Sequence, residues 1–257
     1  MSFREFLERL QTSLVVRHIA TSGQELRTAS PGESVETVQA LMEAEDFDVI
    51  PVMSRDSIDC YFERQSCGPP LRKAVVVANV VSADLALLEL IQHFAESGRY
   101  FYLTLGGRRI DGIVTRADLN KLAVRVLIYA ILNRLELLLS EVVNAYCEDS
   151  QWLPLLDEVS RKKVEDRIHQ ARSQNVELPP TAYLDLSDLL QLCKKTPKTW
   201  EKLGVQSAKE MKSRYGPLVD LRNDIAHPVR SLVSASKDAT RLWKRIDTAL
   251  RAVANLE

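Results

Sequence analysis

The chain has 257 residues, of which 46% are hydrophobic and 27% are charged, a balance typical of soluble globular proteins. This length allows two compact domains, each with its own core. The four cysteines show no C-x-x-C pair and no repeated spacing, and they stand at Cys60, Cys67, Cys147 and Cys193. This usage argues against a disulfide framework or a zinc site, and it favours a reducing cytoplasmic location.

The formal net charge of −1 is the sum of two unequal halves. Residues 1–120 carry 12 Lys and Arg against 17 Asp and Glu, whereas residues 121–257 carry 22 against 18. A basic half is compatible with a nucleic-acid partner, although a difference this small also arises by chance. The most apolar run, residues 122–139, contains Arg125, Arg134 and Glu136, so it is typical of a core helix rather than a membrane span. We therefore expect no membrane partner.

Between residues 20 and 120 the sequence alternates β-like runs with amphipathic helices, and it does so twice. In the first unit, apolar residues recur at helical spacing over residues 35–42, and residues 47–53 follow as a strand. In the second, a helix over residues 85–94 precedes a strand at 100–105, a turn at GGRR and a strand at 110–114. This repeated β-α-β-β-α unit predicts two small sheets packed side by side.

At Thr115 the pattern changes to all helix. Thr115 and Asp118 have the spacing of a capping box, and from there to about Tyr146 no Gly or Pro interrupts the helical period. Further helices are predicted at about 155–174, 183–194, 206–226 and 236–255. The predicted fold class is thus α+β, with an α+β domain at 1–120 and an all-helical domain at 121–257.

The stretch GIVTRAD, residues 112–118, combines the residue types of a nucleotide-binding corner. Amides at a helix N-terminus attract phosphate, Arg116 has the charge to bind phosphate, and Asp118 can accept from ribose hydroxyls. The competing interpretation is that Thr115 and Asp118 only cap the helix, and the two roles are compatible. GIVTRAD resembles the signature of CBS domains, and the doubled unit resembles a CBS pair. The resemblance implies an adenine nucleotide (AMP, ADP or ATP) as a regulatory ligand contacting Thr115, Arg116 and Asp118.

The first copy matches the CBS pattern in DFDVIPVM but departs from it at CYFERQS. Cys60 stands where glycine is expected, Glu63 at the hydroxyl position and Ser66 at the aspartate position. Because the carboxylate of Glu63 repels phosphate, we expect only the second copy to bind a nucleotide in the usual manner.

A second motif, LRNDIAHPVR, lies near the C-terminus and ends a predicted helix. Pro228 disfavours helical backbone at His227, and a bend there would bring His227 toward Arg222. Histidine moves protons near neutral pH, while arginine binds phosphate and stabilises its charge. Asn223 can orient the imidazole or donate to a phosphate oxygen. The competing interpretation is that Arg222 and His227 only cap the helix C-terminus.

Arg222, Asn223 and His227 match the R-N-x-x-x-H signature of the HEPN family, which residues 121–257 resemble. A long first helix with an acidic residue, here Glu136 or Glu141, is also similar to that family. The resemblance implies a homodimer with a composite, metal-independent endoribonuclease site that leaves 2′,3′-cyclic phosphate ends on RNA. It also suggests a toxin-like or defence role.

We therefore predict a CBS-like pair followed by a HEPN-like helical bundle, acting as a nucleotide-regulated endoribonuclease with no metal or catalytic cofactor. The alternative is a non-catalytic adenine-nucleotide-sensing adaptor whose helical domain mediates dimerisation or partner binding. Coupling between the halves is expected through the helix that begins near Asp118, which requires that the ligand bind two arrangements with different affinity.

Overall fold

The computed structural model describes residues 3–146, 152–176, 178–235 and 238–257. The chain divides into two compact units, Met1–Val124 with Val233–Thr240, and Arg125–Leu232 with Arg241–Glu257. The first division lies close to residue 120, where the sequence pattern changes, and the segment 233–240 joins the first unit. Cys147 lies outside the described residues.

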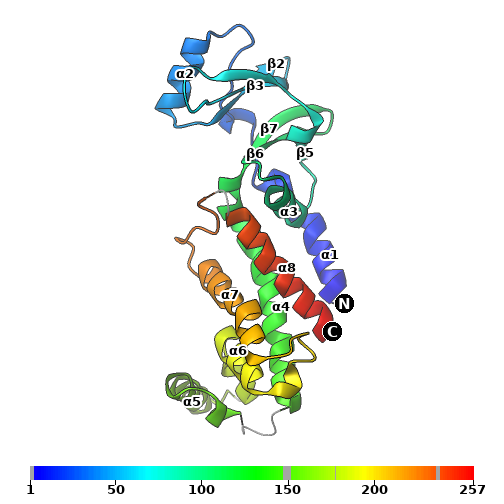
Figure 1. Cartoon of the computed structure of the whole chain (residues 1–257), viewed down its shortest axis with the longest axis vertical. Helices are drawn as coiled ribbons and strands as arrows, with labels where there is room; N and C mark the ends of the chain where they lie inside the picture. The colour runs from blue at the N-terminus through cyan, green and yellow to red at the C-terminus, as the bar shows by residue number, and fades with distance from the viewer. Residues whose placement is uncertain (1–2, 147–151, 177, 236–237) are drawn as a thin grey trace. The chain divides into compact units, whose positions relative to one another are not determined.

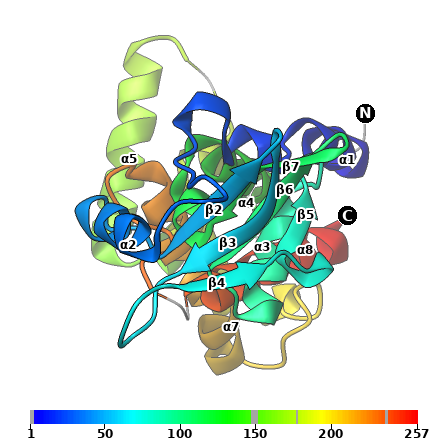
Figure 2. The same cartoon turned by 90° about the horizontal axis from the view of Figure 1, so that it is seen from above.

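The first unit contains two small sheets, whose strands are seen side by side in Figure 2. A four-stranded sheet has the order β1-β7-β6-β5, with β5 parallel to β6 and the other pairs antiparallel. A three-stranded antiparallel sheet has the order β2-β3-β4. The strands are β1 (Thr21–Ser22), β2 (Val49–Ser54), β3 (Ser57–Glu63), β4 (Leu71–Ala74), β5 (Val80–Ser82), β6 (Phe101–Gly106) and β7 (Arg109–Thr115). The helices are α1 (Phe3–Ser13), α2 (Val35–Ala44) and α3 (Leu87–Ser97).

Each sheet buries the apolar face of one helix. The hydroxyl of Ser34 caps α2 by accepting from the Thr37 N–H at 3.2 Å, and Val38 and Met42 of α2 pack against β2 and β3. On the second sheet, Phe94 of α3 packs against Tyr102 of β6 with their ring centroids 5.0 Å apart. The predicted alternation of strands and helices is thus confirmed.

The two sheets share one core. Tyr61 of β3 and Phe101 of β6 meet edge to face at 5.2 Å, and Leu26, Ile58 and Leu103 are buried in the same cluster. The sheets are also joined by a hydrogen bond in which the Ile110 N–H donates to the Ser57 hydroxyl at 3.3 Å. This shared core positions the edge of both sheets on which the candidate site is built.

The predicted continuous helix from Thr115 to Tyr146 is wrong, because the chain turns at Lys121. Arg116–Asn120 is a short 3-10 helix, Lys121 is extended (φ −67°, ψ 155°), and α4 begins afterwards as Leu122–Tyr146. The break is held by contacts from distant segments. Asn120 exchanges two hydrogen bonds with the backbone of Val233, at 2.8 and 3.1 Å, and the Lys121 ammonium donates to the Ile19 carbonyl at 2.6 Å.

The described part of the second unit is helical throughout its regular elements, as predicted. Beside α4 it contains α5 (Glu158–Ser173), α6 (Leu186–Lys195), α7 (Ala208–Ala226) and α8 (Asp238–Leu256). Asp157, Asp185 and Ser207 cap α5, α6 and α7 with side-chain oxygens. The helix α7 runs through Pro217 instead of ending at the Gly-Pro pair.

The helices α4, α7 and α8 are amphipathic and pack together, as Figure 1 shows. Arg134 of α4 pairs with Glu257 at 3.1 Å, and Arg245 of α8 pairs with Asp224 of α7 at 3.8 Å. The buried apolar residues recur three or four positions apart, at Leu127, Ile128, Ile131 and Leu135 on α4, Met211, Tyr215, Leu218, Leu221 and Ile225 on α7, and Leu242, Ile246, Ala249 and Val253 on α8. Within the described residues, no helix has the length and apolar character needed to cross a membrane.

A buried arginine fixes the end of α7. Arg125 of α4 is 7% exposed, and its guanidinium donates to the carbonyl of Asp224 at 2.7 Å and to the carbonyl of Arg230. The C-terminal carbonyls of a helix have no partner within the helix, and they carry partial negative charge. Arg125 therefore satisfies the end of α7 and fixes the turn over residues 227–230 against α4.

We expect Arg125→Met to lower the free energy of unfolding by about 3 kcal/mol, because the carbonyls of Asp224 and Arg230 lose a buried, charged donor. Urea unfolding followed by circular dichroism measures the change, with Arg161→Met on the exposed face of α5 as the control. Equal unfolding midpoints for the two variants would contradict the role assigned to Arg125.

Candidate functional site

A cavity of about 440 Å³ lies in the first unit, at the edge where the two sheets meet. Its size is within the range of small-molecule sites. One part of its lining is apolar and includes aromatic rings, at Leu26, Phe47, Val49, Pro51, Tyr100, Phe101 and Ile113. The other part is polar, at Thr21, Glu25, Arg27, Asp46, Asp48, Thr115, Arg116 and Asp118. The structure thus brings Thr115, Arg116 and Asp118, the three predicted nucleotide contacts, to one cavity.

The end of α2 supplies one side of this cavity. Asp46 has a left-handed backbone (φ 54°), and the Phe47 N–H donates to the Met42 carbonyl at 2.9 Å, which is the pattern of a Schellman cap. This cap turns the chain so that residues 46–48 line the cavity. Arg64 lies 3.3 Å from Asp46 and 3.6 Å from Asp48, so two of the lining carboxylates already have a cationic partner.

The turn after β7 supplies the opposite side. The carboxylate of Asp118 accepts from the Thr115 N–H at 2.7 Å and from the Thr115 hydroxyl at 2.9 Å. Its other oxygen is 2.8 Å from the ammonium of Lys121, and the Asp118 side chain is only 12% exposed. The predicted pairing of Thr115 with Asp118 is therefore present, and it fixes the carboxylate at the cavity.

Two backbone amides at the start of this turn already have partners. The Thr115 N–H is bound by Asp118, and the Arg116 N–H donates to the Tyr100 carbonyl at 3.0 Å. The turn is a 3-10 helix of five residues, so it also lacks the dipole of a long helix. The long helix begins only at Leu122, and phosphate binding by the other amides of this turn stays a prediction.

The side chain of Arg116 is the exception in this satisfied turn. Its Nη1 atom is buried and has no hydrogen-bond partner among the described residues. A buried donor without a partner is costly, and a guanidinium prefers anionic oxygens. Arg116 thus lines the cavity while its Nη1 atom lacks a partner among the described residues.

The glycine of GIVTRAD has a packing role. A Cβ on Gly112 would lie 2.4 Å from the Thr104 hydroxyl and 2.9 Å from the Thr21 carbonyl. Gly112 pairs with Ser22 of β1 and Thr104 of β6, so only glycine lets these strands approach so closely. Gly112 thus places β1, and with it Thr21, beside the cavity.

The first copy of the motif is built differently. Glu63 ends β3, and the chain then continues through a loop to β4 with no helix. Glu63 pairs with Lys73 of β4 and accepts from the Tyr100 hydroxyl at 2.5 Å. Burial acts to raise the pKa of Glu63, but the hydrogen bonds from Lys73 and Tyr100 outweigh it and hold this pKa below its usual value. The carboxylate is thus charged and paired within the first unit, and the expectation that this copy does not bind phosphate stays a prediction.

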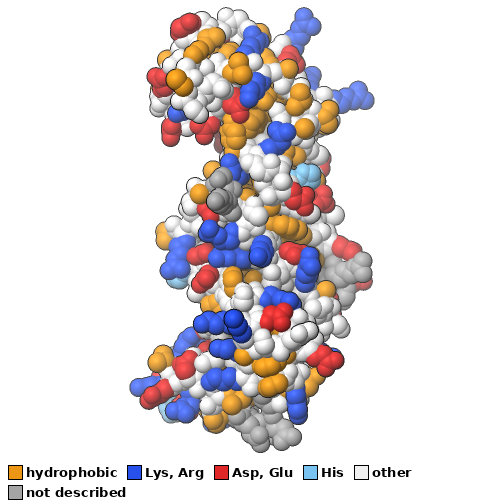
Figure 3. Space-filling model, viewed as in Figure 1, with side chains coloured by type: hydrophobic (Ala, Val, Ile, Leu, Met, Phe, Trp, Pro, Cys, Tyr) orange, Lys and Arg blue, Asp and Glu red, His pale blue; other side chains and the backbone are white. Residues whose placement is uncertain are grey.

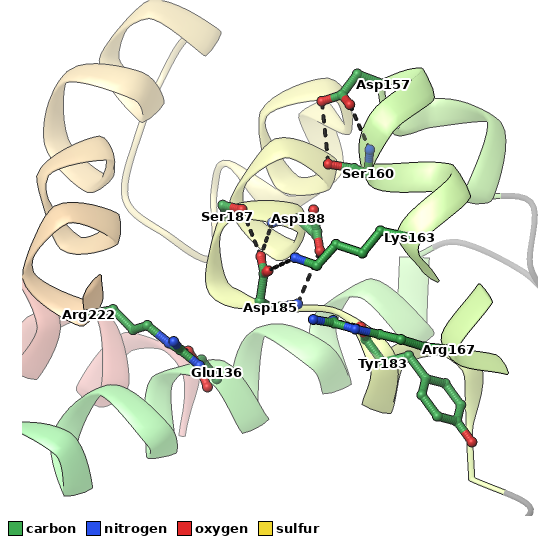
Figure 4. Close-up of polar contacts among 10 residues, drawn as sticks. All are labelled: Glu136, Asp157, Ser160, Lys163, Arg167, Tyr183, Asp185, Ser187, Asp188 and Arg222. Atoms are coloured by element: carbon green, nitrogen blue, oxygen red, sulfur yellow. Dashed lines mark hydrogen bonds and ion pairs between the residues drawn. The ribbon is translucent and has the colours of Figure 1, made fainter. Parts of the chain in front are cut away.

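In the second unit, Arg222 of α7 points toward Glu136 of α4, as Figure 4 shows. The Arg222 Nε atom lies 3.4 Å from the Glu136 carboxylate. The two terminal nitrogens of Arg222 make no hydrogen bond within the described part of the chain. Of the two acidic candidates on α4, Glu136 is the one that meets Arg222, while Glu141 is exposed. Burial raises the pKa of Glu136, and Arg222 acts in the opposite direction.

Asn223 and His227 follow Arg222 at the end of α7. The His227 N–H donates to the Asn223 carbonyl at 3.1 Å, and His227 is extended (φ −111°, ψ 93°), as expected for a residue before proline. The imidazole is exposed, and no hydrogen bond or ion pair joins it to Arg222 or to any other described residue. Within one chain, therefore, the bend at Pro228 leaves Arg222 bound to Glu136 and His227 open to solvent.

A network of ion pairs and caps lies beside Glu136 and Arg222 (Figure 4). Lys163 of α5 pairs with Asp185 at 2.5 Å, and Asp185 and Asp188 cap each other's N–H groups at 3.2 Å. Burial acts to raise the pKa of Asp185, but Lys163 and the hydrogen bonds hold it far below its usual value. Burial raises the pKa of Asp188, which is 1% exposed. These contacts fix the start of α6 on α5.

Comparisons with known proteins find only limited similarity to this chain. No family model and no curated protein matches the chain. The solved structure of CBSX2 in complex with AMP matches 44% of this chain and 94% of that one, at 15% identity and a TM-score of 0.36. The CBS domain of a bacterial CNNM/CorC family Mg²⁺ transporter in complex with ATP matches 49% and 98%, at 17% identity and a TM-score of 0.34. CBS-domain proteins are thus similar to less than half of the chain, and no function of this protein rests on that likeness.

Sequence reasoning missed several lining residues. Arg27 and Glu25 reach the cavity from a short 3-10 segment, and Tyr100 reaches it from the start of β6. No periodic signal marks these positions, because their approach depends on β1 pairing with β7 far along the chain. The carboxylates of the DFD sequence, residues 46–48, by contrast follow a predicted helix, and this position in the sequence could have indicated that they line the site.

The pKa of Glu136 provides a test of its pairing. Because Arg222 lowers this pKa against the effect of burial, Arg222→Met should raise it further, whereas Arg214→Met on the same helix should leave it unchanged. Carboxyl ¹³C chemical shifts followed over a pH titration measure both. Because the pKa is already raised in the folded state, ionisation of Glu136 opposes folding, and its contribution to stability falls as the pH rises through that pKa. A lower or unchanged pKa in Arg222→Met would contradict the pairing.

Proposed function

We propose that the first unit is a sensor that binds an adenine nucleotide in the cavity lined by Thr115, Arg116 and Asp118. The observation that carries this proposal is the buried Arg116 nitrogen, which has no partner in the described part of the chain. A phosphate supplies the anionic oxygens that this nitrogen lacks. The resemblance of GIVTRAD to the CBS signature points to an adenine nucleotide among phosphorylated ligands.

The remaining lining suits the other parts of a nucleotide. The rings of Phe47, Tyr100 and Phe101 offer apolar surface to a base. Asp118 is held by three hydrogen-bonding contacts, and a carboxylate has lone pairs left to accept from ribose hydroxyls. The paired state of Asp46 and Asp48 reduces repulsion of a phosphate by these carboxylates.

Calorimetry with AMP and adenosine tests this assignment. We expect Arg116→Met to weaken AMP binding by about tenfold or more, because a charge-assisted hydrogen bond is lost, and to leave adenosine binding unchanged. Asp118→Ala should weaken the binding of both AMP and adenosine, because both contain the ribose. Arg108→Met, on the exposed turn between β6 and β7, is the matched control. Undiminished AMP binding by Asp118→Ala and Arg116→Met would remove the site.

We further propose that the helical unit is a metal-independent endoribonuclease that acts as a homodimer. The observation that favours this function is the state of the two signature side chains. Arg222 is held through Nε by Glu136, so its terminal nitrogens are available to a phosphate, and the His227 imidazole is exposed at the end of α7. Because one chain does not join Arg222 to His227, a second copy would complete the site.

In the proposed reaction, the His227 imidazole removes the proton from a ribose 2′-hydroxyl. The 2′-oxygen then forms a bond to phosphorus as the bond from phosphorus to the 5′-oxygen breaks, and the product is a 2′,3′-cyclic phosphate. His227 of the partner subunit would protonate the leaving 5′-oxygen. Arg222 would stabilise the negative charge that develops on the phosphate oxygens, and Asn223 would orient the imidazole or donate to a phosphate oxygen.

Cleavage of labelled RNA in EDTA, with and without ATP or AMP, tests this proposal. We expect His227→Ala to lower the rate by about 10²–10⁴-fold, which is the usual contribution of a general acid or base. His169→Ala, an exposed histidine on α5, should cleave like the unmodified chain. Equal cleavage by His227→Ala, or no cleavage by the unmodified chain with or without nucleotide, would exclude the enzyme and leave the sensing adaptor.

The proposed regulation depends on the connection between the cavity and α4. Lys121 directly precedes α4 and pairs with Asp118 at the cavity. A ligand that engages Asp118 therefore acts on the pairing of the residue before α4, provided that it binds two arrangements of this turn with different affinity. The two candidate functions differ in what the nucleotide regulates. It is RNA cleavage in the endoribonuclease and partner binding in the adaptor.

A further inference from the structure

A basic groove lies on the helical unit between α7 and α8. It has a volume of about 480 Å³ and is lined by Glu210, Ser213, Arg214 and Pro217 of α7 and by Arg241, Lys244, Arg245 and Thr248 of α8. Four of these eight residues are Lys or Arg and one is acidic. The groove is therefore a concave surface with an excess of positive charge.

The single acid of the groove is neutralised within the groove. Glu210 accepts from Arg214 at 2.6 Å, and Arg245 lies 3.8 Å from Asp224. Arg241 and Lys244 are exposed, and the Lys244 ammonium makes no hydrogen bond or ion pair with the described residues. The α8 side thus presents cations at positions 241, 244 and 245, which share one helical face.

The α7 side offers a polar backbone group. Pro217 has no N–H, so the carbonyl of Ser213 lacks the donor that an α-helix usually supplies four residues later. Ser213 and Pro217 both line the groove, and Thr248 lies opposite on α8. The hydroxyl-bearing residues Ser213 and Thr248 therefore line the groove beside the cations.

The α8 side of the groove lies near the C-terminal end of α7. Arg245 pairs with Asp224, and Asn255 lies 3.5 Å from the Cβ position of Gly204, so α8 runs antiparallel to α7. The start of α8, with Arg241, therefore lies beside the C-terminal end of α7. Figure 3 shows Lys and Arg side chains gathered over this part of the two helices.

We propose that this groove binds the backbone of single-stranded RNA and directs it to His227. This inference rests on the proposed ribonuclease function and names where its substrate binds. The span from Arg241 to Thr248 is about 10 Å at 1.5 Å per residue, which is long enough for its cations to contact two neighbouring phosphates of one strand. The Ser213 carbonyl can accept from a 2′-hydroxyl, which DNA lacks.

Fluorescence anisotropy with fluorescein-labelled single-stranded RNA tests the groove. The measurement uses the full chain with His227→Ala, so that the RNA stays intact. We expect addition of Arg241→Gln and Lys244→Gln to weaken RNA binding by about tenfold or more and to reduce the slope of log K against log salt by about 1.4, which corresponds to two phosphates on a single strand. DNA of the same sequence should bind more weakly than RNA.

The matched control is the pair Arg161→Gln and Lys162→Gln on α5. Both residues are exposed, and the pair changes the net charge by the same amount as the groove variant. Equal weakening by the two pairs would show a general charge effect and overturn the groove, as would no RNA binding by the chain. Equal displacement of the RNA by polyglutamate would overturn the assignment to RNA in favour of any polyanion.

The two proposals fail separately. If the unmodified chain does not cleave RNA but binding depends on Arg241 and Lys244, the groove stands and the ribonuclease falls. If cleavage depends on His227 but RNA binding is unaffected by the substitutions of Arg241 and Lys244, the ribonuclease proposal is supported and the groove proposal is contradicted. Binding and cleavage measured on the same variants therefore decide both.

Discussion

The buried Nη1 atom of Arg116, which lacks a hydrogen-bond partner among the described residues, is the constraint on which the sensor interpretation depends. An unsatisfied buried donor costs about 1–3 kcal/mol, and more when it is charged. Around Arg116 the donors of the same turn have partners, since the Thr115 amide and hydroxyl bind Asp118 and the Arg116 amide binds Tyr100. The turn therefore folds from its own contacts and leaves one cationic nitrogen for an anion. In this interpretation, Thr115 and Asp118 build the site, and Arg116 binds the ligand.

The helical unit likewise contains one arginine that stabilises the fold and another that keeps donors for a ligand. Arg125 is buried and donates to the carbonyls of Asp224 and Arg230, so it fixes the end of α7 without any ligand. Among the described residues, Arg222 makes its one side-chain ion pair through Nε to Glu136, which leaves its terminal nitrogens for another partner. His227 lies between the two residues whose carbonyls Arg125 binds. A rigid support beside exposed reactive groups is the arrangement that a preorganised phosphate site requires.

Local signals in the sequence were sufficient for much of this. The helical and strand periods predicted the repeated unit and the helices, the Thr115–Asp118 spacing predicted their capping contact, and Pro228 predicted the non-helical His227. Contacts between distant segments were not visible. The helix break at Lys121 depends on Asn120 binding Val233, and the role of Arg125 depends on two carbonyls about a hundred positions away. Strand β4 was missed as well, because its short segment carries no period and forms only by pairing with β3.

The central claim is that Arg116 receives the phosphate of a nucleotide. A crystal structure of the chain grown with AMP tests it most directly. The account predicts density for AMP in the cavity, with a phosphate oxygen within hydrogen-bonding distance of Arg116 Nη1 and the ribose at Asp118. AMP bound elsewhere, or bound in the cavity with its phosphate away from Arg116, would contradict it.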